Sequence, residues 1–124
     1  MAHTTYDASS AKAKELRKKA GSYVRTLRHA ADLTQREVAQ ALHLDYYTFI
    51  SQLESGYGRV PPNLYIPLAK VLGVNPHEVT REMVKFYDPF TYEGLFGKHP
   101  YIETDDTLKE RTARNTKRKG KAEA

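Results

Sequence analysis

The chain has 124 residues, with 20 Lys and Arg against 15 Asp and Glu, so its formal net charge is +5. This length suits one small domain with extensions. The absence of cysteine excludes disulfide scaffolds, Cys-based zinc sites and thiol catalysis. No apolar run approaches the roughly 18 residues of a membrane span, and the first residues lack the apolar segment of a secretory signal. We therefore expect a cytoplasmic protein without a membrane partner.

The positive charge is concentrated at the two ends of the chain. Residues 1–32 carry seven Lys and Arg against three acidic residues, and residues 104–124 carry seven against four. Residues 33–103 are slightly acidic. Residues 1–9 and 104–124 contain too few large apolar side chains to offset the entropy of ordering, so both are expected to be disordered. The basic C-terminal tail is either a solubilising terminus or an arm that binds phosphates.

The spacing of apolar residues predicts an all-α domain of five helices over residues 10–87, because no segment alternates with the period of a strand. The first helix covers residues 10–31, in which Gly21 marks a break or the start of the packed part. Residues 88–103 are predicted to form a separate aromatic arm.

The next two helices are short and lie close together in the chain. The second covers Gln35–Leu42, and Thr34 with Glu37 three residues later forms a capping box. Three residues of turn follow, and Asp45 is the expected cap of a third helix over residues 46–55.

The last two helices are bounded by proline, glycine and asparagine. The fourth begins at Pro62 or Asn63 and ends before Gly73. The fifth covers residues 76–87, with Asn75 as its cap.

Two short helices joined by a tight turn are typical of a helix-turn-helix. The segments LTQREVAQALHL, ISQLESG and LAKVLGVNPHEV resemble the Cro/C1-type helix-turn-helix family of bacterial and phage regulators. The resemblance covers about residues 22–84. It implies a fold like that of lambda repressor, double-stranded DNA as the partner, and a homodimer.

The third helix departs from the family pattern by one residue between Asp45 and Ile50. One extra residue turns a helix by about 100°, so we take its exposed face from periodicity. If Ile50 and Leu53 face the core, an uncharged polar face lies opposite and suits contacts with base edges. An ordinary solvated face is the alternative, and Tyr46 fits the core as well as the DNA. The candidate residues here are Tyr46, Tyr47, Thr48, Ser51 and Gln52.

Further candidates flank this helix and suit contacts with phosphates. Gln35 resembles the family glutamine that contacts the DNA backbone and braces the third helix. The others are Arg36, Tyr57, Arg59 and Asn63, each of which is otherwise plain surface. In similar proteins an arginine of the first helix pairs with the glutamate of E-x-G, which implies a structural pair of Arg28 with Glu54.

The aromatic arm holds large side chains that rarely stay solvated together. Pro89 and Gly94 are expected to prevent a regular helix there. The arm either packs on its own domain or forms an interface with a second copy or another protein. The residues concerned are Phe86 and Tyr87, at the end of the fifth helix, with Phe90, Tyr92, Leu95 and Phe96 of the arm.

The five histidines are scattered and no catalytic arrangement has a supporting motif, so we expect no metal, no cofactor and no enzymatic activity. The leading hypothesis is a sequence-specific transcriptional regulator associated with the nucleoid. Two alternatives stay open: an antitoxin-like or partner-binding module, and a non-specific binder of the nucleoid or of RNA.

Overall fold

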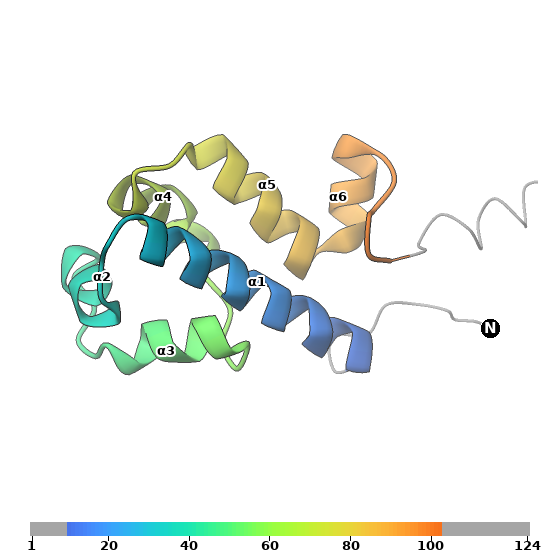
Figure 1. Ribbon diagram of the computed structural model, residues 1–124. Coiled ribbons are helices and arrows are strands. Elements are labelled where there is room, and N and C mark those ends of the chain that lie inside the picture. The colour runs from blue at the N-terminus through green and yellow to red at the C-terminus, as the bar shows by residue number, and fades with distance from the viewer. Residues whose placement is uncertain (1–9, 103–124) are drawn as a thin grey trace, which may run out of the picture.

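The computed structural model describes residues 10–102, so the predicted N-terminal segment and basic tail lie outside the described residues. The described range is all-α and contains no strand, as predicted. Figure 1 shows the helices arranged around the long first helix. They are α1 (Ala11–Ala30), α2 (Gln35–Ala41), α3 (Thr48–Ser55), the 3-10 turn η1 (Pro62–Leu64), α4 (Tyr65–Leu72), α5 (Pro76–Tyr87) and α6 (Pro89–Phe96).

Side chains cap the helices where the sequence indicates. The amide of Glu37 donates to Thr34 Oγ1 at 3.0 Å, and the amide of Thr34 donates to the Glu37 carboxylate at 2.9 Å. Asn75 accepts from the amide of His77 at 2.8 Å. These bonds satisfy amides that have no partner within the first helical turn. The predicted capping box of α2 and the predicted cap of α5 are therefore confirmed.

The third helix begins later than predicted, at Thr48 rather than residue 46. Asp45 does not cap it, and the residue before the helix, Tyr47, makes no side-chain cap bond. α2 ends in a turn in which His43 adopts a left-handed backbone with φ of 58°. Residues 45–47 then bridge to α3, so the extra residue is taken up by the connection. Tyr46 consequently precedes the helix and is 74 % exposed, which corrects its possible assignment to the core.

The prediction that the aromatic arm lacks a regular helix is wrong, because residues 89–96 form α6. Pro89 occupies the first helical position, where the N–H that proline lacks would have no partner in any case. Asp88 caps the helix by accepting from the amide of Thr91 at 3.2 Å. Gly94 lies inside the helix, and a Cβ at this residue would meet no other atom within 4 Å.

The core lies where α1 crosses the other helices. α1 contributes Leu16, Ala20 and Val24, all almost fully buried. In Figure 1, α3 lies on one side of α1 and α5 on the other. Gly21 lies within α1 and does not break it; a Cβ at this residue would come within 2.3 Å of the carbonyl oxygen of Glu54. The close crossing of α1 and α3 thus requires glycine here. The core residues of the other helices include Ile50, Leu53, Leu68, Leu72, Val79 and Met83.

Candidate nucleic-acid interface

The helix α3 presents one apolar side to the core and one uncharged polar side to solvent. Ile50 and Leu53 are buried, as predicted from periodicity. On the opposite side, Thr48, Gln52 and Ser55 are exposed and Ser51 is half-buried. Hydroxyl and amide groups on an exposed helix can donate to and accept from base edges in a major groove.

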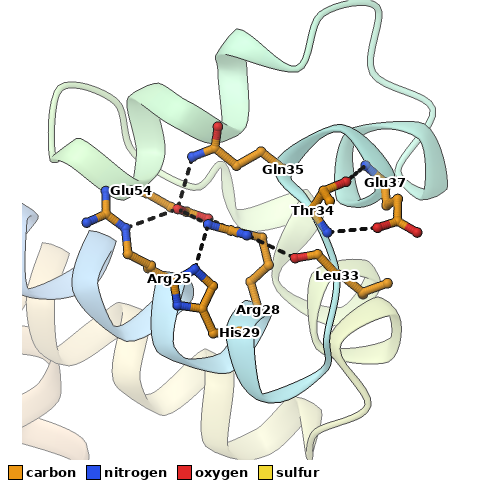
Figure 2. A network of polar contacts seen from close by, with 8 residues as sticks. All are labelled: Arg25, Arg28, His29, Leu33, Thr34, Gln35, Glu37 and Glu54. Carbon is orange, nitrogen blue, oxygen red and sulfur yellow. Dashed lines mark hydrogen bonds and ion pairs between the residues drawn. The ribbon is translucent and has the colours of Figure 1, made fainter.

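Glu54 lies on the inner side of α3 and anchors it to α1 and α2 (Figure 2). Arg28 donates to the two carboxylate oxygens, through Nε at 2.6 Å and through its terminal nitrogen at 2.9 Å. Gln35 donates to the same carboxylate at 3.1 Å, and Arg25 donates at 3.3 Å. Arg28 also donates to the carbonyl of Leu33 at 2.9 Å. The pair of Arg28 with Glu54 implied by the family resemblance is present, within a network that also includes Gln35, Arg25 and, through Arg28, the ring of His29.

The network determines the charge state of Glu54. Burial by itself would raise the pKa of this carboxyl, but hydrogen bonds from Arg28 and Gln35 together with the charge of Arg28 bring the pKa below its usual value. The same contact with Glu54 raises the pKa of Arg28. Both groups are therefore charged throughout the physiological range. Because Glu54 is buried on the inner side of α3, its charge does not lie on the exposed side of the helix.

Tyrosines surround the start and the end of α3. The ring of Tyr47 lies under the guanidinium of Arg36, with 4.9 Å between the guanidinium carbon and the ring centroid. Tyr46 is exposed before the helix, and Tyr57 after it is 89 % exposed. Tyr47 and Arg36 also border an open, polar depression of about 660 Å³ between the end of α1 and the start of α2. Of the predicted residues, Gln35, Arg36 and Tyr47 are thus brought together at this depression.

The loop after α3 contains two further candidates. Arg59 is exposed, and its guanidinium contacts Tyr87. The guanidinium lies 4.7 Å from the ring centroid of Tyr87 and donates to the carbonyl of Tyr87 at 3.5 Å. Asn63 is exposed within η1, a turn that no side chain caps. Gln35 is half-buried because its amide group braces α3 through Glu54.

The aromatic arm divides into a buried and an exposed part. Phe86 and Tyr87 belong to the core, so of the two alternatives left open, packing on their own domain applies to these two residues and an interface does not. They lie on the inner face of α5, which packs against α1. Tyr92 is half-buried and its ring contacts that of His99. The remaining residues, Phe90, Leu95 and Phe96, are exposed on α6.

Three exposed apolar side chains border a groove between α4, α5 and α6. Leu95 is 67 % exposed, Phe96 51 % and Ile66 52 %. The groove has a volume of about 350 Å³, and Val84 contributes to its floor. Leu95 and Phe96 are thus residues of the predicted arm whose apolar side chains remain exposed beside this groove.

Sequence reasoning missed two residues that hold the structure together. Arg25 contributes to the Glu54 network, and its position one helical turn before Arg28 could have indicated this. His99 is buried; it donates from Nε2 to the carbonyl of Lys85 at 2.6 Å and accepts at Nδ1 from the amides of Tyr101 and Ile102 at 3.0 and 3.1 Å. No local sequence pattern indicates the contact with Lys85, because that residue lies 14 positions earlier, in α5.

Within residues 10–102, no helix is both long enough and apolar enough to cross a bilayer. The same range contains no cluster of three His, Asp or Glu side chains that could hold a metal ion.

The arrangement of α2, the turn and α3 defines a helix-turn-helix, and comparison with known protein families agrees with this geometry. Residues 19–82 match the family described as a helix-turn-helix domain, which is just over half of the chain. The chain therefore belongs to the helix-turn-helix family, a family of DNA-binding domains. No curated protein matches the chain.

Proposed function

We propose that the protein is a sequence-specific transcriptional regulator that reads double-stranded DNA through α3. The observation that carries the proposal is the exposed, uncharged side of α3, with Thr48, Ser51 and Gln52, on a helix fixed from behind by the buried Glu54 network. An amide such as that of Gln52 suits bidentate contact with adenine, and a threonine methyl suits the methyl group of thymine. A rigid support behind these groups reduces the entropy lost when they bind.

Residues around α3 would contact the DNA backbone in this proposal. Arg36 and Arg59 supply cations, and Tyr57 and Asn63 supply exposed polar groups beside them. Contacts of this type fix the register of a protein on the duplex without reading its sequence. Tyr46 and Tyr47 would lie at the end of α3 nearest the bases.

The experiment that tests the proposal selects binding sites from random duplex DNA at physiological salt. We expect an enriched consensus. Gln52→Ala should relax one base position by about 1–3 kcal/mol, whereas Gln40→Ala, which removes an exposed glutamine of α2, should leave the consensus unchanged. Selection of no consensus would contradict sequence-specific binding and would favour a non-specific binder of the nucleoid or of RNA.

We further propose that the protein binds DNA as a homodimer through the groove between α4, α5 and α6. Leu95, Phe96 and Ile66 form an apolar surface of the kind that usually marks a contact. A two-fold contact brings the same surface of both copies together, and it would present two recognition helices to half-sites about 34 Å apart. Sedimentation of the full chain should therefore give a dimer, and a dimeric protein should select a palindromic consensus.

The same apolar groove also suits an antitoxin-like or partner-binding module. A substitution in the groove distinguishes this alternative from the homodimer. Leu95→Gln should convert the dimer to a monomer, and Tyr57→Ser, which changes an exposed aromatic residue elsewhere, should not. A wild-type monomer that selects a single, non-palindromic site would contradict the homodimer and favour a groove that takes another protein.

A further inference from the structure

Tyr87 lies beyond the matched helix-turn-helix region and yet contacts the loop that follows the recognition helix. The match ends at residue 82, within α5, and Tyr87 is the last residue of that helix. Its hydroxyl accepts from the amide of Val60 at 3.1 Å. Its ring and its carbonyl both contact the guanidinium of Arg59, at 4.7 and 3.5 Å. One buried side chain therefore holds two consecutive loop residues.

The loop needs such support because it has little regular structure of its own. After the left-handed residue Gly56, the amides of Tyr57 and Gly58 both donate to the carbonyl of Gln52 at 3.1 Å. Val60 is buried, and its amide donates to the Tyr87 hydroxyl. A buried amide without a partner costs about 1–3 kcal/mol. The hydroxyl of Tyr87 therefore fixes the backbone at the point where the loop enters the core.

The contact with Arg59 orients this side chain but leaves its charge available. A tyrosine ring and a backbone carbonyl are both uncharged, so neither neutralises the guanidinium, and Arg59 remains exposed to solvent. Burial raises the pKa of Tyr87, although the amide of Val60 acts in the opposite direction, so the hydroxyl remains neutral. An exposed cation held in one orientation suits a phosphate oxygen.

The end of α5 is itself held by the segment that follows it. In a continuous helix the carbonyl of Lys85 would accept from the amide of residue 89, but that residue is proline and has no N–H. His99 donates to this carbonyl instead, at 2.6 Å. Tyr101 stacks on Phe86, with 6.3 Å between the ring centroids. His99 and Tyr101 therefore hold the last turn of α5, which carries Tyr87.

We propose that Tyr87 is a positioning residue for DNA binding: it holds the loop so that Arg59 contacts one backbone phosphate. This inference rests on the proposed function, because it assumes that the loop after α3 meets the DNA. It assigns a role in DNA binding to a residue that neither touches the DNA nor lies in the matched region.

The test is a double-mutant cycle between Tyr87 and Arg59, read as duplex affinity at several salt concentrations. Arg59→Gln should lower the slope of log affinity against log salt by about 0.9, the value for one neutralised phosphate. Tyr87→Phe keeps the ring and removes the hydroxyl, and we expect affinity to fall by about 2- to 12-fold, corresponding to one hydrogen bond. In the Arg59→Gln background the same change should cost less than about twofold, because the guanidinium that Tyr87 positions is already absent.

The matched control is Tyr23→Phe, which removes the hydroxyl of a half-buried tyrosine whose ring packs on Phe86. Thermal melts of all variants separate an effect on binding from an effect on folding. If Tyr87→Phe does not fold, Arg59→Lys gives the second measurement, since lysine keeps the charge without the planar stack and should lose similar affinity while keeping the salt slope.

Equal affinities for Tyr87→Phe and Tyr23→Phe would overturn the inference while leaving the proposed function intact. Losses from Tyr87→Phe and Arg59→Gln that simply add would also overturn it. A wild-type chain that binds no duplex would overturn the proposed function and the inference with it.

Discussion

Glu54 is the residue on which the position of α3 depends. Its carboxylate is buried and accepts from Arg28, Gln35 and Arg25. A buried carboxylate is stable only while it is paired, because removing either partner leaves a charge or a set of donors without compensation. Breaking this network therefore costs more stability than breaking a surface ion pair.

Removing the carboxylate should destabilise the fold strongly. We expect Glu54→Ala to lower the free energy of unfolding by about 3–5 kcal/mol, since it leaves the buried Arg28 unpaired. Arg25 is 52 % exposed in its side chain, so Arg25→Gln should cost less than about 1 kcal/mol. Urea denaturation of both variants measures the difference, and similar losses would contradict the central role of the buried pair.

Two glycines inside helices should respond to alanine in opposite directions. Gly21→Ala places a Cβ 2.3 Å from the carbonyl oxygen of Glu54, whereas Gly94 has open space around it. We expect a loss of about 1–3 kcal/mol or more for Gly21→Ala and a gain of up to about 1 kcal/mol for Gly94→Ala, because alanine favours a helix. Thermal unfolding compares the two; a neutral Gly21→Ala would show that α1 and α3 can move apart.

At the scale of the elements, the sequence predicted the helices whose ends depend on local contacts. Thr34 and Glu37 cap α2 through bonds to amides only three residues away, so their spacing was sufficient. The start of α3 was predicted wrongly because Tyr47 is placed by Arg36 of another helix, and no local cap marks it.

The start of α6 is the second helix boundary that was predicted wrongly. Pro89 is compatible with both a helix break and a helix start, and the cap from Asp88 determines the outcome. Within the Glu54 network, the pair of Arg28 with Glu54 and the bracing of α3 by Gln35 were predicted, because the family resemblance supplied both, whereas Arg25 was missed. Burial of Tyr87 depends on its contacts with the loop after α3, which periodicity within its own segment does not give.

The contact between His99 and α5 should make the end of the described chain sensitive to acid. Burial lowers the pKa of His99 from 6.5, and the charge of Lys85 lowers it further, although the bond to the Lys85 carbonyl opposes this. Nδ1 accepts two amides, which a protonated ring cannot do. A lowered pKa favours the neutral ring in the folded state, so the stabilisation is complete above about 6.5 and is lost as the pH falls below it.

Chemical shifts measured by NMR should report this transition. The amide signals of Tyr101 and Ile102 should move together with the ring signals of His99 at a midpoint below 6.5, the unshifted histidine value. His99→Gln should remove the dependence, and His77→Gln, which changes an exposed histidine, should retain it. Amide signals that stay constant while the ring titrates would contradict the coupling.

At the scale of the whole molecule, specificity and charge are separated along the chain. The exposed side of α3 is uncharged, whereas residues 107–121 carry seven Lys and Arg and only one acidic residue. In the proposed function, α3 would supply discrimination between sequences and the basic tail would supply general affinity for DNA. The two properties should therefore respond to different changes in the chain.

Deletion of residues 107–124 should weaken binding to all duplexes by a similar factor. The slope of log affinity against log salt should become shallower by about 0.9 for each phosphate that the tail neutralises. Binding of a selected site and of an unrelated duplex, each measured from low to physiological salt, tests this. An unchanged slope would show that the tail does not act on phosphates.

The exposed tyrosine at the end of α3 also has a spectroscopic consequence. The chain contains no tryptophan, so a single indole would be its only strong fluorophore at long excitation wavelengths. Tyr57, 89 % exposed and beside the proposed DNA-contacting loop, is the aromatic position at which that indole would disturb packing least. Tyr57→Trp would give the protein an emission signal, free of background, at the loop whose orientation Tyr87 is proposed to set.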